Sequence, residues 1–162
     1  MNGGWRERLD LEPNLEGGYY RQTYESDAVV ETPHGPRPLL NSIHYLLTPE
    51  SPIGHLHRNR SAITHFHHHG GPATYLLVAP DGELHHVVLG SDLDAGHVVS
   101  FTAPGGWWKT SHIVPGANEC LISEAVSPGF RYDDHEMATV EAIVAEHPSL
   151  VDQLRPSILD PA

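Results

Sequence analysis

Short runs of strand-forming residues recur along most of this chain, and they limit the folds that it can adopt. Runs rich in β-branched and aromatic residues are typical of β-strands, and the Gly and Pro clusters between them are typical of turns. Many short strands at this spacing indicate an antiparallel barrel or sandwich rather than a parallel α/β sheet. The predicted strands cover residues 18–25, 39–48, 53–57, 63–68, 73–78, 84–89, 97–102, 107–113 and 119–127.

Helical spacing of apolar residues is confined to the two ends of the chain. It predicts a short helix over residues 2–12 and a helical segment over residues 137–154. A chain of 162 residues has the usual size of one domain. We therefore expect a single all-β domain over residues 1–162, with a core barrel at about 18–132 and a helical tail at about 133–162.

Charge and composition narrow the range of partners. The formal net charge at pH 7 is −12 and the sequence has no cluster of Lys or Arg, so nucleic acids and anionic membranes are poor partners. No window is long and apolar enough for a membrane span, and the N-terminus lacks the apolar stretch of a secretory signal. The single cysteine, Cys120, cannot form an internal disulfide. We expect a soluble, cytoplasmic protein whose partner is a small molecule.

Histidine is the outlier in the composition, with 14 His against 9 Lys and Arg together. The segment PIGHLHRNRSAITHFHHHGG places His55 with His57, and His65 with His67, at alternate positions. Alternate side chains of a strand share one face, so four imidazoles meet in one cavity if both faces turn inward. Such a cluster suits one divalent metal, namely Zn, Mn, Fe, Ni or Cu. A metal-free polar pocket built from the same imidazoles and a surface cluster remain open as alternatives.

Five motifs, in the same order along the chain, resemble those of the cupin superfamily, and within it the family labelled as a domain of unknown function, DUF985 or Cupin_5. LEPNLEGGYYRQTYES is similar to the opening pattern L-E-P-H-P-E-G-G-Y-[FY]-R-E-T-Y, and SIHYLLT is similar to the second strand motif. HLHRNRSAITHFHHHGG corresponds to H-R-x-x-S-D-E-x-W-H-x-Y-x-G. DGELHHVVLGSDLDAG and VSPGFRYDDHEMA resemble the hairpin and the closing V-x-P-G-F-[DE]-[FY]-x-D-F-E. The resemblance implies a cupin jelly-roll barrel (a double-stranded β-helix) and a homodimer.

The departures from the family pattern lie in its central motif. Ile63 stands where the pattern has Glu, His65 where it has Trp, and Phe66 where it usually has His. Metal-binding cupins in general carry two histidines and a glutamate on their first motif, and a fourth histidine on their second. The glutamate position of that set is therefore apolar in this sequence.

The resemblance makes His55 and His57 the histidine pair of the first motif. Lys109 occupies the position of the fourth ligand, where this family usually has Gln. A cationic lysine is a poor neighbour of a metal, so a bound metal would need His65 or His67 in place of the missing ligands. Lys109 itself is either a solvated strand residue or a clamp for an anionic group of the substrate.

Four further residues are candidates for binding a substrate, and each has a structural alternative. Trp108 is either core or a wall of an aromatic pocket. Tyr19 and Arg21 share a strand face, where Arg21 either holds an anionic substrate or pairs with Glu25. His112, three residues after the lysine, reaches the face of that lysine only if a bulge intervenes.

Three functions remain open for these residues. The first is an acid–base enzyme (isomerase, epimerase, lyase or dehydratase) for a small polar or carbonyl-bearing metabolite, in specialised metabolism, with His65, His67 and Lys109 as catalytic residues. The second is a metal-dependent oxygenase that uses Fe, Cu or Ni. The third is a non-catalytic cupin that binds a ligand. The metal content of the untagged protein and its turnover separate these classes.

Overall fold

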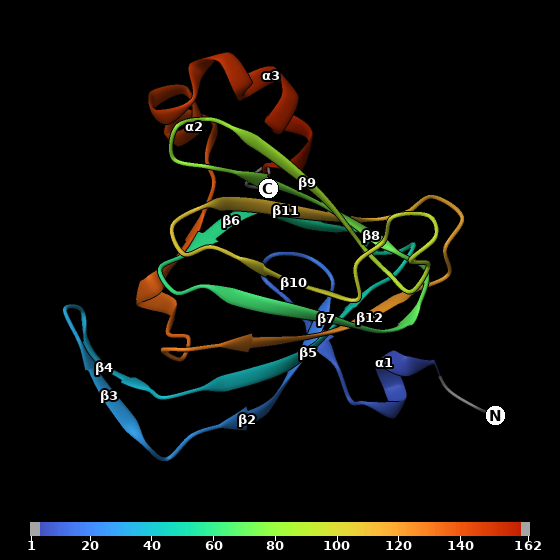
Figure 1. Cartoon of the computed structure of the whole chain (residues 1–162), viewed down its shortest axis with the longest axis horizontal. Helices are drawn as coiled ribbons and strands as arrows, with labels where there is room; N and C mark the ends of the chain where they lie inside the picture. The colour runs from blue at the N-terminus through green and yellow to red at the C-terminus, as the bar shows by residue number, and fades with distance from the viewer. Residues whose placement is uncertain (1–3, 160–162) are drawn as a thin grey trace.

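Two antiparallel β-sheets face each other in the computed structural model, which describes residues 4–159 (Figure 1). The six-stranded sheet has the order β1 (Glu12–Pro13), β2 (Tyr19–Glu25), β5 (Asn41–Leu47), β12 (Cys120–Val126), β7 (Ile63–Gly70) and β10 (Ser100–Ala103). The five-stranded sheet has the order β13 (His135–Met137), β6 (Ile53–Asn59), β11 (Trp108–Ile113), β8 (Ala73–Val78) and β9 (Leu84–Leu89). This arrangement confirms the predicted all-β jelly roll, formed by two sheets rather than by one continuous closed sheet.

A two-stranded hairpin, β3 (Val29–Thr32) and β4 (Gly35–Pro38), extends away from the two large sheets (Figure 1). The sequence predicts only a turn here, because Pro residues interrupt both strands. Pro is tolerated on edge strands, where its missing N–H faces solvent. The strand predicted at 97–102 is also shorter than expected, since regular pairing with β7 begins at Ser100.

Apolar side chains fill the space between the sheets, and a second apolar cluster lies on the outer face of the five-stranded sheet. The inner cluster includes Tyr45, Leu47, Tyr75, Leu89 and Ile122. The outer cluster joins Leu56, Val78 and Trp108 to the helical tail through Ile143, Leu154 and Ile158.

The helical tail is built from short elements. They are α2 (Val140–Glu146), η2 (Pro148–Leu150), α3 (Val151–Leu154) and η3 (Arg155–Ser157), preceded by the single 3₁₀ turn η1 (Tyr132–Asp134). The Thr139 side chain accepts a hydrogen bond from the backbone N–H of Ala142 and caps α2. At the other end of the chain the predicted helix is short, α1 (Trp5–Arg8), and residues 2–3 of that prediction lie outside the described residues. No helix between residues 4 and 159 has the length and apolar character needed to cross a membrane.

A β-bulge in β6 decides which side chains of this strand point inward. His57 pairs with Lys109, but Gly54 pairs with Ser111, so two residues of β6 lie opposite one residue of β11. The extra residue breaks the alternation of side chains between the faces. Gly54 lies against the Ser111 hydroxyl between the sheets, whereas Leu56 belongs to the outer cluster under the tail.

Candidate functional site

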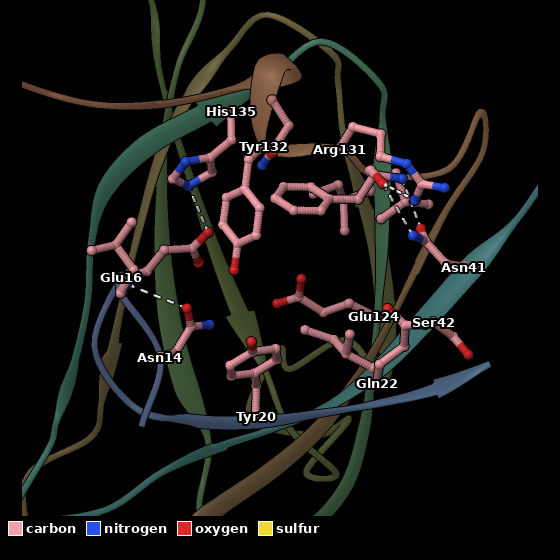
Figure 2. Close-up of a pocket in the computed structure, with 16 residues that line it drawn as sticks. Asn14, Glu16, Tyr20, Gln22, Asn41, Ser42, Glu124, Arg131, Tyr132 and His135 are labelled. Carbon is pink, nitrogen blue, oxygen red and sulfur yellow. Dashed lines mark hydrogen bonds and ion pairs between the residues drawn. The ribbon is translucent and has the colours of Figure 1, made fainter. Parts of the chain in front are cut away.

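A cavity of about 210 Å³ is lined by residues of both sheets, near the η1 turn. Figure 2 shows Glu16 and Glu124 pointing toward this space from different sides, with His135 beside Glu16. Glu124 comes from β12 and His135 from β13, while Glu16 precedes β2. The Tyr20 and Tyr132 rings also border the cavity, and Tyr132 is 64% exposed.

Glu16 holds two histidines of the five-stranded sheet. Its Oε2 lies 3.2 Å from Nε2 of His57, and its Oε1 lies 2.8 Å from Nε2 of His135. The pairing of β13 with β6 brings these histidines together, and their ring centroids are 5.4 Å apart. One ligand atom from each of the three residues lies within 4.8 Å of the other two, which forms a candidate metal site.

The protonation state of His57 leaves a lone pair directed at Glu16. Nδ1 of His57 lies 2.6 Å from the His55 carbonyl oxygen, so this nitrogen carries the hydrogen and donates it. Burial lowers the pKa of His57 to about 4, although the Glu16 carboxylate opposes this effect, and the ring is neutral at pH 7. The Nε2 lone pair therefore faces a carboxylate oxygen, and Nε2 has no hydrogen-bond partner within the described chain. A cation between the two atoms would satisfy both.

Glu16 is ionised despite its enclosed position. Burial raises its pKa, but His57 and the hydrogen bond from His135 together lower the pKa by more, so the net pKa lies below the ordinary value. Two imidazoles and one carboxylate are a ligand set that suits a divalent first-row metal. The residues present thus fit a metal, with the unpartnered Nε2 of His57 as the strongest sign.

A second buried group of charges lies beside the first. Nζ of Lys109 is 3.2 Å from Nε2 of His65, and Nδ1 of His65 is 3.2 Å from Oε1 of Glu124. Lys109 is the chain's sole lysine and is only 4% exposed, so the solvated alternative is wrong. His65 is fully enclosed and stacks on Phe101 with a centroid distance of 4.8 Å.

The three side chains of this group lie in a row, with neutral His65 between the Lys109 ammonium and the Glu124 carboxylate. Burial and the Lys109 ammonium lower the pKa of His65, so the ring is neutral, accepts from Lys109 at Nε2 and carries its hydrogen on Nδ1. Burial raises the pKa of Glu124, but Lys109 and His65 outweigh it and hold this pKa well below its usual range. Glu124 therefore presents a carboxylate to the cavity.

The four imidazoles of the central segment do not converge as predicted. The bulge turns His55 toward the tail, where its Nδ1 lies 3.3 Å from the Ser157 carbonyl oxygen, so it does not share a face with His57. His67 lies opposite Ile122, further along β7, and its Nε2 is 3.3 Å from the Gly71 carbonyl oxygen. No hydrogen bond or ion pair in residues 4–159 joins His67 to the cavity groups. Only His57 and His65 of the predicted four approach the interior carboxylates.

None of the four predicted substrate-binding residues lines this cavity. Trp108 and His112 alternate with Lys109 and face the tail: Nε1 of Trp108 donates to Glu146, and Nε2 of His112 is 3.1 Å from the Ser157 hydroxyl.

Tyr19 and Arg21 do share a face, but it is the outer one. The Tyr19 ring lies 4.1 Å beneath the Arg6 guanidinium. Arg21 pairs with Asp10 and not with Glu25. Tyr20, between them, faces the cavity instead.

Sequence reasoning missed three of the residues that surround the cavity, although each left a signal. Glu16 lies in the opening motif, within the E-G-G-Y match. His135 stands where the closing pattern has Phe, so it is a departure of this chain. Glu124 occupies an inward position in an otherwise apolar alternating strand, two residues after Ile122.

Comparisons with known proteins agree on the fold. The family model described as "Cupin superfamily (DUF985)" matches residues 4–138. The uncharacterized protein YML079W of Saccharomyces cerevisiae is 38% identical over 134 residues, which are 74% of this chain but only 66% of the yeast protein. A hypothetical protein from Leishmania major superposes with a TM-score of 0.90 and 30% identity over 96% of this chain and 97% of its own.

More distant neighbours share the architecture alone. Oxalate decarboxylase from Bacillus subtilis superposes with a TM-score of 0.58 at 19% identity, over 92% of this chain and 37% of the decarboxylase.

Proposed function

This chain belongs to the DUF985 family of the cupin superfamily, and we propose that its cavity is the active site of an acid–base enzyme for a small polar or carbonyl-bearing metabolite. One observation carries the proposal: two ionised carboxylates, Glu16 and Glu124, face the same cavity, and each has its own buried nitrogen partners. Active sites that transfer protons typically contain titratable groups whose surroundings shift their pKa values. The reaction classes that fit are isomerisation, epimerisation, elimination and dehydration.

Glu124 is the proposed proton acceptor. Its carboxylate lines the cavity and is ionised at neutral pH, because Lys109 and His65 hold its pKa low. His65 and Lys109 lie behind it and do not line the cavity, so the proposal makes them positioning residues instead of the predicted catalytic ones. They keep the Glu124 carboxylate ionised and fix its orientation. His67 has no part in this mechanism.

A divalent metal fits the other half of the site. Glu16, His57 and His135 would hold it, through the atoms that now lie within 4.8 Å of one another. When bound, such an ion polarises a carbonyl or hydroxyl oxygen as a Lewis acid. The His55 carbonyl fixes the tautomer of His57 so that Nε2 stays available, and Glu16 keeps His135 turned toward the cavity.

A second candidate function follows from the same three residues. Two histidines and one carboxylate with open positions are also the ligand set of non-haem iron oxygenases. The Lys109–His65–Glu124 group favours proton transfer, since an oxygenase has no need of an ionised carboxylate across the cavity. Stoichiometric iron together with substrate-dependent oxygen consumption would overturn the acid–base proposal.

Metal analysis of the freshly purified, untagged protein tests the metal half. We expect near-stoichiometric divalent metal in the wild type, loss of that metal in His57→Gln, and no loss in His55→Gln. The two substitutions are matched in chemistry and lie two residues apart on opposite faces of β6. Equal metal content in both variants would contradict the assignment.

Solvent deuterium exchange, followed by NMR on a panel of small aldehydes, ketones and sugars, tests the chemistry. We expect exchange at a carbon next to a carbonyl group, and a loss of at least about 100-fold in Glu124→Gln. Ligand binding without exchange of any panel member would leave only a binding module.

The predicted homodimer and cytoplasmic location stay part of the proposal. The resemblance to cupins supports the dimer, and Phe66, which is 40% exposed on β7, is the apolar surface residue chosen to test it. Sedimentation velocity on the wild type and on Phe66→Glu measures this directly. A monomeric wild type would contradict the dimer.

A further inference from the structure

We infer that the cavity selects an uncharged polyhydroxylated ligand, a polyol or sugar, because the Glu124 carboxylate and the amide oxygen of Asn59 face it, while the described lining offers no free cationic side chain to pair with an anion. The inference rests on the proposed function for the location of the site and goes beyond it in naming the ligand class. Three features carry it: the acceptor atoms, the absence of a free cation among the described lining residues, and the aromatic border.

The acceptor atoms are found on two side chains. Glu124 lines the cavity with His65 and Lys109 behind it, and an ionised carboxylate accepts hydrogen bonds but donates none. Asn59 is 7% exposed and lines the same cavity, and its Oδ1 has no hydrogen-bond partner in the described structure. A buried acceptor without a donor is unfavourable, so Oδ1 of Asn59 favours a ligand that brings an O–H group, and the Glu124 carboxylate can accept a further one.

The cationic side chains near the cavity already bind other side chains of the protein. Arg131 lines it, but both terminal nitrogens bind the Glu25 carboxylate, at 2.9 and 3.3 Å. The Lys109 ammonium is turned to His65 behind Glu124. A carboxylate or phosphate ligand would therefore lie against Glu124 with no free cationic side chain to pair with among residues 4–159. Glu124 faces the ligand in this way whether or not a metal is held on the opposite side.

The cavity border suits the rest of a sugar. The rings of Tyr20 and Tyr132 lie at the border, and Phe130 packs against Tyr132 with a centroid distance of 5.1 Å. Aromatic faces cover the C–H faces of a ring while acceptor groups bind its hydroxyls. The volume of about 210 Å³ is roughly seven times that of one water in the liquid, which fits a small metabolite of pentose or hexose size.

A panel of similar sugars that differ in charge tests the ligand class. The neutral probes are xylitol, D-xylose, D-glucose, D-galactose and D-mannose; the anionic probes are D-xylonate, D-glucuronate and D-galacturonate; the cationic probe is D-glucosamine. Calorimetry and saturation-transfer NMR measure binding to the protein as purified. We expect a neutral probe to bind saturably at millimolar concentrations or below, and its acid counterpart to bind at least about tenfold more weakly. Failure of every neutral probe, or binding confined to the acids or to the amine, overturns the inference.

Two variants locate the effect at the acceptor atoms. Asn59→Leu should weaken binding of the neutral probe by about tenfold, since it removes one acceptor. Asn118→Leu, an equivalent change at an exposed residue between β11 and β12, should not change it. Glu124→Gln should reduce the discrimination against the acid probes. Unchanged discrimination in Glu124→Gln would contradict the charge argument even if Asn59→Leu does not fold.

The outcomes separate this inference from the function on which it rests. A neutral sugar that binds without any solvent exchange contradicts the acid–base enzyme and leaves the ligand class intact. Acid probes that bind and exchange protons contradict the ligand class and leave the enzyme intact.

Discussion

The two faces of β6 and β11 carry the same kinds of residue and use them differently. On the inner face, His57 and Lys109 lie near carboxylates and a cavity. On the outer face, His55 and His112 lie against Ser157 of the helical tail. The difference lies in the partners: charged groups inside, and a carbonyl and a hydroxyl outside.

The inner face also leaves hydrogen bonds unmade, and the outer face does not. In the described part of the chain, the buried side-chain polar atoms without a hydrogen-bond partner are Nε2 of His57, Oδ1 of Asn59, Nδ1 of His65 and the hydroxyl of Tyr75. All four residues lie on the inner side of the sheets. Unpartnered buried groups are costly, and they persist where function requires them. The comparison therefore supports the proposal that the inner face is functional and the outer face structural.

Replacing the buried lysine should give the largest effect on this comparison. Lys109→Met leaves the Glu124 carboxylate in the interior without its main counter-charge. Breaking a buried ion pair from one side costs about 3–5 kcal/mol in the free energy of unfolding. Urea denaturation at neutral pH measures this cost.

The control for this change removes an exposed cation from the tail. Arg155→Met should change the free energy of unfolding by no more than about 0.5 kcal/mol. Adding Glu124→Gln to Lys109→Met should recover part of the loss, because the unpaired charge is then gone. If Lys109→Met costs no more than the control, the inner group is not an energetically coupled set.

The sequence was sufficient to predict most of the fold. Strands such as β8 and β9 have the predicted bounds, because alternation and turn residues are local properties. The β3–β4 hairpin was missed because Pro residues look like strand breakers when the edge position of a strand is not known.

The site was harder to predict, for two physical reasons. A bulge is a property of strand pairing, so nothing in HLH reveals that His55 and His57 lie on opposite faces. Glu16 and His135 are 119 residues apart, and their contact depends on the three-residue strand β13. His57, His65 and Lys109 were found because residue type alone marked them as unusual for a strand interior.

A medium effect is expected at the outer face when a hydrogen bond to a charged group is removed. Trp108→Phe deletes the N–H that donates to Glu146 at 3.0 Å, while Arg58 still binds that carboxylate. The free energy of unfolding should fall by about 1.5–3 kcal/mol. Metal content and ligand binding should not change, because Trp108 faces the tail.

The neighbouring tryptophan supplies the matched control. Trp107 is half-buried and packs its ring 5.0 Å from that of His85, so Trp107→Phe should cost less than Trp108→Phe in the same denaturation experiment. A loss of metal or of ligand affinity in Trp108→Phe would break the division between the faces, since the outer face would then act on the site.

The smallest expected effect is a change in the pH dependence of stability at the outer face. Burial and the nearby His55 lower the pKa of His112 in the folded protein. The unfolded chain, with an ordinary pKa of ~6.5, therefore binds the proton of this residue at higher pH than the folded protein does. Stability is unaffected well above that pH and falls as the pH drops below it. His112→Gln removes this contribution, so the free energy of unfolding should depend less steeply on pH below ~6.5.

Urea denaturation at a series of pH values measures this slope, and the difference between variant and wild type isolates His112. His57, whose pKa is about 4, also weakens the fold on acidification, but it does so in both proteins and cancels in the difference. His86→Gln, at an exposed position of β9, is the control and should keep the wild-type slope. An identical slope in all three proteins would show that the tail does not hold His112 in its neutral form. The comparison between the two faces would then be wrong for His112, because burial under the tail would not affect its protonation.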